Sequence, residues 1–169
     1  INSAFRINSD EIYYSILPTS TQYARNALFA GMLPLQIAQR FKDKWLNDVD
    51  EGGKNQFERD FLEAQLSRIA PGISFNYNKI TKLEKGRQLA DNVRNLLKDK
   101  LSVIVYNFVD LLSHVRTEME VLKELAEDEA AYRSLTVSWF EHSPLYEIVE
   151  QLSREKVNLI ITTDHGSVK

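Results

Sequence analysis

Short continuous runs of apolar residues alternate along the chain with longer amphipathic stretches. Two runs rich in β-branched residues, at positions 101–110 and 157–164, predict buried strands, and runs at 12–18 and 73–80 are weaker strand candidates. Apolar runs that contain few polar residues are typical of parallel strands covered on both faces. The pattern therefore predicts a largely parallel sheet.

The stretches between these runs have the spacing and the boundary residues of helices. The segment "TQYARNALFAG" opens with Thr21 and closes with Gly31, a pair of residue types that suits a helix start and stop. Further helices are expected in the segments 33–46, 56–69, 81–100, 111–142 and 143–156. Strands that alternate with helices indicate an α/β fold, with a largely parallel sheet flanked by helices.

Length and composition indicate how the chain is organised into domains. The chain has 169 residues, of which 43% are hydrophobic and 27% charged, as in a globular protein. We expect one domain over residues 1–169, with a helical insertion near 50–100. The chain begins with Ile1 and ends a few residues after its last apolar run, so we expect it to be a segment of a larger domain.

Charge and cysteine content exclude several classes of protein. The net charge is −3, which argues against a general nucleic-acid-binding surface. No apolar run approaches 18 residues, so we expect no membrane span. The absence of cysteine excludes disulfides and thiolate metal sites, and we expect a cytoplasmic protein.

Polar residues of catalytic type follow the predicted strands. In α/β sheets, ligands bind beyond the carboxyl ends of the strands, so these positions are expected to converge. The first strand candidate runs into "PTSTQYARN", where Thr21 lies at the start of a helix. A threonine there serves either as a helix cap or, beside a cation, as a nucleophile.

The strong strands are each followed by an aspartate and a histidine. Asp110 and His114 are four residues apart, which places them on one face of a helix, and Asp164 and His165 precede Gly166. Each pair alone could be a helix cap or an ordinary strand end. Together with Thr21 they favour a site for Zn²⁺ or a similar cation. The third histidine, His142, is interpreted as a cap or packing residue.

These motifs, in this order, resemble those of a known family. The order P-T-x-T, then D-x-x-x-H, then T-x-D-H-G resembles the alkaline phosphatase superfamily. Within it, "PTSTQYARNALFAGMLP" and "TTDHGSVK" are similar to the PglZ family, and most similar to the effector domain of PorX-like response regulators. The resemblance covers essentially the whole chain and implies an alkaline-phosphatase-like fold.

The resemblance also implies a function and a set of site residues. It implies a metal-dependent phosphoester hydrolase with two zinc sites. Hydrolysis of phosphodiesters is expected in preference to hydrolysis of phosphomonoesters. Thr21 would be the nucleophile and would share one metal with Asp164 and His165, while Asp110 and His114 would bind the other. Arg25 and Asn26 would hold phosphate oxygens. Two further ligands of the superfamily would lie before the first residue and after the last.

The expected partners follow from the same resemblance. They are a phosphoester or nucleotide-type small substrate and an upstream receiver domain, with a homodimer among the expected assemblies. The domain would then be the output module of a two-component response regulator. Two alternatives remain open: a non-catalytic signalling or binding domain that keeps a structural metal site, and a plain α/β domain without metal.

Overall fold

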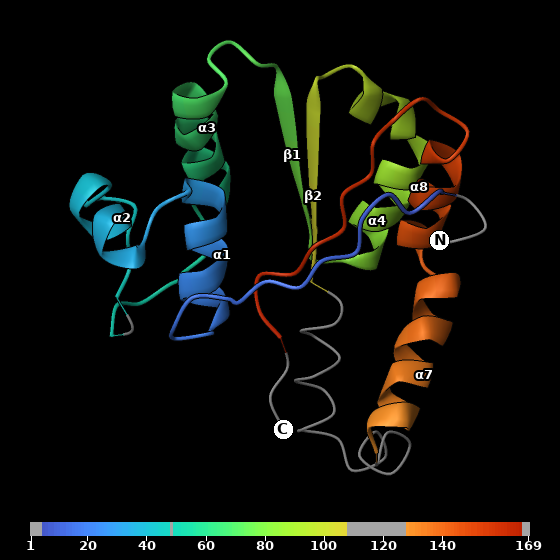
Figure 1. The fold of residues 1–169 in the computed structure, drawn as a ribbon, viewed down its shortest axis with the longest axis horizontal. Helices are drawn as coiled ribbons and strands as arrows, with labels where there is room; N and C mark the ends of the chain where they lie inside the picture. Colours follow the sequence, from blue (N-terminus) through green and yellow to red (C-terminus); the bar gives the residue numbers. More distant parts are fainter. Residues whose placement is uncertain (1–4, 48, 108–127, 167–169) are drawn as a thin grey trace. The chain divides into compact units, whose positions relative to one another are not determined.

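The computed structural model describes residues 5–47, 49–107 and 128–166 (Figure 1). The chain forms two compact units. The sheet unit consists of residues 1–7 and 74–158, and the helical unit consists of residues 8–73 and 159–169.

The sheet unit is built on two parallel strands. β1 (Phe75–Ile80) pairs with β2 (Leu101–Tyr106), so that Phe75 lies opposite Leu101 and Ile80 opposite Tyr106. Parallel neighbours need a crossover connection. It is made here by α4 (Leu83–Asp91) and the 3₁₀ helix η1 (Val93–Leu97).

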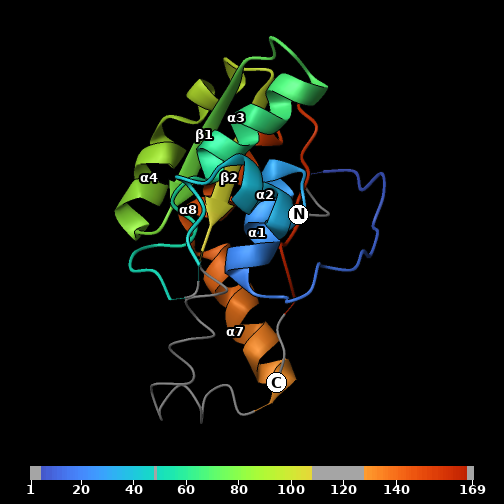
Figure 2. The same cartoon turned by 90° about the vertical axis from the view of Figure 1, so that its left-hand side faces the viewer.

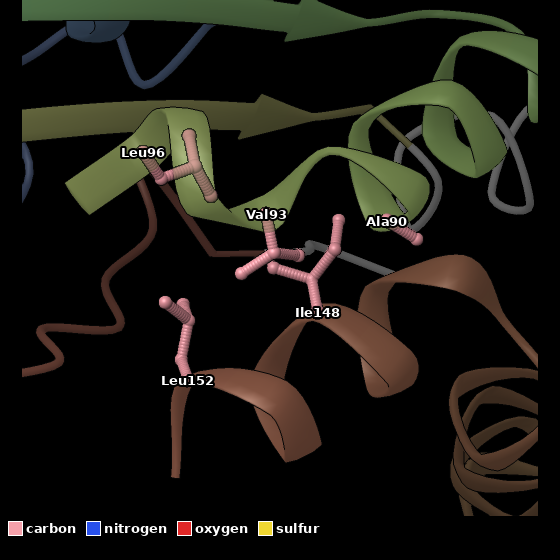
Figure 3. Close-up of a cluster of buried hydrophobic side chains, with 5 residues drawn as sticks. All are labelled: Ala90, Val93, Leu96, Ile148 and Leu152. Atoms are coloured by element: carbon pink, nitrogen blue, oxygen red, sulfur yellow. The ribbon is translucent and has the colours of Figure 1, made fainter. Parts of the chain in front are cut away.

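The core of the sheet unit lies between this crossover and a later helix. α8 (Pro144–Leu152) begins after Ser143, whose side chain accepts a hydrogen bond from the Tyr146 N–H. Both views show α4 next to α8 (Figure 1, Figure 2). Five buried apolar side chains fill the space between the crossover and α8 (Figure 3): Ala90, Val93, Leu96, Ile148 and Leu152.

α7 (Glu129–Glu141) completes the described part of the sheet unit. Its N-cap Asp128 accepts a hydrogen bond of 2.7 Å from the Ala131 N–H. Trp139 packs its ring against that of Tyr106, with centroids 5.5 Å apart. Burial raises the pKa of the Tyr106 hydroxyl above its usual value of 10.0, because the charged phenolate loses solvation.

The helical unit contains α1 (Thr21–Ala30), α2 (Pro34–Arg40) and α3 (Glu58–Ile69). α1 packs against both α2 and α3. All three helices contribute buried apolar side chains to the helical unit: Ala24, Phe29, Ala30, Ile37, Phe61, Leu62 and Leu66. None of the described helices of either unit is long and apolar enough to cross a membrane.

Most of the predicted elements are present among the described residues; of the helix expected at 111–142, the part before residue 128 lies outside them. The α/β class is confirmed, with a small parallel sheet flanked by helices. The helix expected at 33–46 ends early, at Arg40. The helix expected at 81–100 divides into α4 and η1, because the Asn92 side chain donates to the Gln88 carbonyl and competes with the helical backbone. The single domain with an insertion near 50–100 stays a prediction; β1 lies within that range.

Two predicted strands are wrong. In the described structure, residues 12–18 and 157–164 form no strand. Side chains hold the two segments together: the Tyr13 hydroxyl donates to the Thr163 carbonyl, and the Ser15 hydroxyl donates to the Asp164 carbonyl at 2.7 Å. Ile160 and Ile161 are 85% and 64% exposed. An apolar run indicates burial, whereas a strand also needs main-chain partners along its length.

Candidate functional site

Thr21 is the first residue of α1. Ser20 occupies the N-cap position with extended backbone angles, and its carbonyl accepts the Ala24 N–H at 2.9 Å. Ser20, and not Thr21, therefore holds the cap position. The Thr21 hydroxyl points to a histidine from the other end of the chain: its Oγ1 lies 2.8 Å from Nε2 of His165.

The backbone orients the His165 ring. Its Nδ1 lies 2.8 Å from the carbonyl oxygen of Gly166, and a carbonyl can only accept a hydrogen bond. In the neutral imidazole, Nδ1 therefore carries the proton and Nε2 presents its lone pair to the Thr21 hydroxyl. This arrangement suits either of two tasks, removal of the hydroxyl proton or binding of a cation.

Asp164 is held from two sides. Its Oδ2 accepts a hydrogen bond of 2.9 Å from Nε of Arg25, which makes an ion pair between side chains that are only 13% and 9% exposed. Its carbonyl oxygen accepts from the Ser15 hydroxyl. Arg25 also forms an ion pair with Glu58 of α3, with 3.6 Å between Nη1 and Oε1. The Asp164 side chain is thus fastened to α1, one turn beyond Thr21.

Asn26 fastens a loop to α1. It is 2% exposed, and its Nδ2 donates to the Lys54 carbonyl at 3.1 Å. The Asn55 side chain donates to Oδ1 of Asn26 and to the carbonyl of Thr21, both at 3.1 Å. The loop between α2 and α3 therefore lies against the first turns of α1. Contact of Asn26 or Arg25 with phosphate stays a prediction.

A groove adjoins this group of residues. It has a volume of about 380 Å³ and runs along α1 from Ala24 to Gly31. Asp164 lines the groove together with Tyr13, Tyr14 and Leu28. Its walls are mostly apolar and aromatic, with a carboxylate among them. A volume above about 300 Å³ falls within the range of small-molecule sites in proteins.

The residues fit a zinc ion in part. A hydroxyl oxygen, an imidazole nitrogen and a carboxylate are all ligand types for Zn²⁺, and the Nδ1–carbonyl contact of His165 is the usual support of a metal-bound histidine. In a tetrahedral site with bonds near 2.0–2.2 Å, neighbouring ligand atoms are roughly 3.3 Å apart. The 2.8 Å between Thr21 and His165 would have to open by about half an ångström.

The described residues supply only part of a ligand set. Within them, no three His, Asp, Glu or Cys side chains gather where a metal could bind. Asp110 and His114, expected at the second metal, lie outside the described residues. His142 is confirmed as a cap: it is the C-cap residue of α7, and its Nδ1 lies 2.7 Å from the Ser138 carbonyl.

Sequence reasoning missed three residues that support this site. Ser15, Asn55 and Glu58 bind Asp164, Thr21 and Arg25 respectively. Ser15 and Asn55 lie in segments without a motif. Glu58 has the common signal of an acidic residue in the first turn of a helix, which on its own indicates only helix stabilisation.

Comparison with known protein families decides the family. The model of the BREX system PglZ alkaline phosphatase-like domain matches residues 1–169. The chain belongs to the PglZ family. Among curated proteins, none matches this chain. A PglZ domain is alkaline phosphatase-like, which agrees with the α/β architecture and indicates a phosphoesterase family.

Proposed function

We propose that this PglZ domain is a metal-dependent phosphoester hydrolase that uses Thr21 as its nucleophile, and that it is more phosphodiesterase than monoesterase. The observation that carries the proposal is the 2.8 Å contact between the Thr21 hydroxyl and Nε2 of His165, at the first residue of a helix. A hydroxyl in that place has both an acceptor for its proton and a helix N-terminus beside it.

Each feature of the site has a part in the proposed reaction. The partial positive charge at the start of α1 favours a phosphate group near Thr21. No acidic residue lies in the first turn of α1 to oppose it. Without a cation, Nε2 of His165 accepts the hydrogen bond of the Thr21 hydroxyl; with a cation on Nε2, the hydroxyl oxygen would bind the same cation instead. The groove beside Asp164 would receive the rest of the substrate, for which we propose a phosphoester or nucleotide-type small molecule.

Thr21, Asp164 and His165 would hold one zinc ion, and Asp110 and His114 the second. When bound, zinc supplies positive charge that favours ionisation of a hydroxyl and offsets charge on the leaving oxygen. By resemblance to PorX-like proteins, we further propose a cytoplasmic output domain of a two-component response regulator, with a receiver domain upstream and a homodimer among its assemblies.

One observation favours a second candidate function. Asp164 already has a cation partner in Arg25, so its position does not depend on a metal. A signalling or binding domain that keeps the residues without catalysis would be compatible with this ion pair.

Hydrolysis of a chromogenic phosphodiester separates the two functions. With added Zn²⁺, the intact protein should turn over the substrate, and a chelator should abolish turnover. Thr21→Ala should reduce the rate about a thousandfold or more, because the nucleophile is lost, while Thr21→Ser keeps a hydroxyl and retains measurable activity. Thr136→Ala is the matched control, since its hydroxyl donates to the Tyr132 carbonyl within α7 in the described part of the chain.

Either of two results would contradict the hydrolase proposal. One is zinc-dependent turnover that Thr21→Ala leaves intact, which would exclude Thr21 as nucleophile. The other is zinc binding without any turnover of diester or monoester substrates, which would favour the signalling function.

A further inference from the structure

Glu58 is a buried charge that the proposed reaction does not use. Only 1% of its surface is exposed, although it is an acidic residue at the first position of a helix, where side chains are usually solvated. Burying a carboxylate costs free energy unless a cation compensates for it. Arg25 of α1 supplies a compensating cation.

Glu58, Arg25 and Asp164 form a continuous line of charges. Arg25 lies between the two carboxylates, with Nη1 3.6 Å from Glu58 and Nε 2.9 Å from Asp164. The guanidinium group is planar, and its N–H groups have fixed directions. The 3.6 Å contact with Glu58 is an attraction between charges and is longer than a hydrogen bond, so Glu58 draws the guanidinium group of Arg25 toward α3. The hydrogen bond from Nε of Arg25 then places Oδ2 of Asp164.

Stabilisation of the helix alone does not explain the burial of Glu58. Asp60, in the same first turn of α3, already supplies a negative charge near the helix N-terminus. Asp60 reaches that place with a partly exposed side chain and pairs with Lys44 at 2.6 Å. Because the partly exposed Asp60 already stabilises the N-terminus of α3, the buried ion pair of Glu58 with Arg25 points to a different role.

We propose that Glu58 and Arg25 are positioning residues that hold Asp164, and through the next peptide His165, in the arrangement that binds the cation. The proposal rests on the proposed function, in which Asp164 and His165 are zinc ligands. Glu58 touches neither the metal nor the substrate, and acts only through Arg25.

Zinc affinity tests this role without measuring catalysis. The intact protein and its variants would compete for Zn²⁺ with a chromophoric chelator. Glu58→Gln keeps the shape of the side chain and removes its charge, and Arg25→Lys keeps the charge and removes the planar group. Each should weaken zinc binding about 10- to 100-fold, the usual effect of losing a residue that supports a metal ligand.

Asp60→Asn is the matched control, because it removes a carboxylate from the same helical turn without touching Arg25. Its zinc affinity should stay within about twofold of the parent protein. Circular dichroism checks that each variant is folded, and Arg25→Lys carries the test if Glu58→Gln does not fold. Zinc affinity unchanged in both Glu58→Gln and Arg25→Lys would overturn the proposal.

A measurement on the metal-free protein separates this proposal from the hydrolase function. The chain has three histidines, so the imidazole NMR signal of His165 can be assigned with His165→Gln. Glu58→Gln should shift that signal, and Asp60→Asn should not. If the parent protein binds no zinc, the proposed function fails, and the shift alone decides whether Glu58 positions this segment. An unshifted signal would overturn the positioning role, as would a shift without loss of zinc affinity in a protein that binds zinc.

Discussion

Thr21 and His165 lie 144 residues apart in the chain, and contacts of neighbouring residues bring them together. Ser15, six residues before Thr21, donates to the carbonyl of Asp164. The Tyr13 hydroxyl donates to the carbonyl of Thr163. Arg25, one turn after Thr21, binds the Asp164 side chain. These hydrogen bonds together fix the segment that carries His165, so that its imidazole faces the Thr21 hydroxyl.

At the residue scale, Gly86 provides a test of packing in the sheet unit. A Cβ atom added at Gly86 would lie 2.8 Å from the Tyr106 hydroxyl oxygen. Alanine inside a helix is favoured over glycine by about 1 kcal/mol, whereas overpacking costs about 1–3 kcal/mol. Gly86→Ala should therefore lower the free energy of unfolding by about 1 kcal/mol, measured by urea denaturation.

The control for this prediction is the same substitution in a Tyr106→Phe background. Phenylalanine lacks the hydroxyl that the new methyl group would meet, so there Gly86→Ala should raise the free energy of unfolding. An effect of the same sign in both backgrounds would show that the Tyr106 hydroxyl does not limit the space at Gly86.

At the element scale, Gly31 ends α1 soon after the residues of the candidate site. Gly31 has φ 57°, in the left-handed region, and its N–H bonds the Ala27 carbonyl at 2.8 Å. This is the usual way for a helix to stop at glycine. The chain then turns into α2, while Thr21 and Arg25 stay on the first two turns of α1.

Two glycines with left-handed backbones allow a matched comparison. Alanine in this conformation costs about 1–2 kcal/mol at either position. Gly72 has φ 81° and open space around it, whereas a Cβ at Gly31 would lie 2.6 Å from the side-chain amide group of Gln65. Gly31→Ala should thus lower the free energy of unfolding more than Gly72→Ala does, by about 1 kcal/mol in urea denaturation. Equal losses would mean that the Gln65 side chain moves aside freely.

At the scale of the whole molecule, the chain has two compact units, each of which contains buried apolar side chains. The contact of Thr21 with His165 and the ion pairs of Arg25 with Asp164 and Glu58 lie within the helical unit. Binding of a cation there adds stability to the folded protein only, because the unfolded chain does not bring these residues together.

Metal addition and removal measure that effect. Zinc at about 100 times its dissociation constant adds about 2.7 kcal/mol, which corresponds to roughly 5–10 °C in the midpoint of thermal unfolding. Chelator should reverse the increase. His165→Gln should abolish it, and His142→Gln should keep it, since His142 is the C-cap residue of α7. An equal increase in both variants would place the bound zinc elsewhere.

Sequence alone determined the features that depend on neighbouring residues. The start and end of α1, the start of α8 after Ser143 and the strands at 75–80 and 101–106 follow from local composition, turn residues and apolar runs. The order of the Thr, Asp-His and Asp-His motifs was also visible, and it led to the PglZ family that the comparison confirms.

The resemblance led us to expect Thr21 beside His165, but only the tertiary structure decided through which contacts distant residues meet. The bond between Thr21 and His165, and the line from Glu58 through Arg25 to Asp164, join segments far apart in the chain. Residues 157–164 have the composition of a strand, yet no strand of the described structure pairs with them and they stay irregular. The composition of a segment indicates how much free energy its burial would contribute. Whether the segment is buried in a sheet depends on which other segments the fold brings next to it.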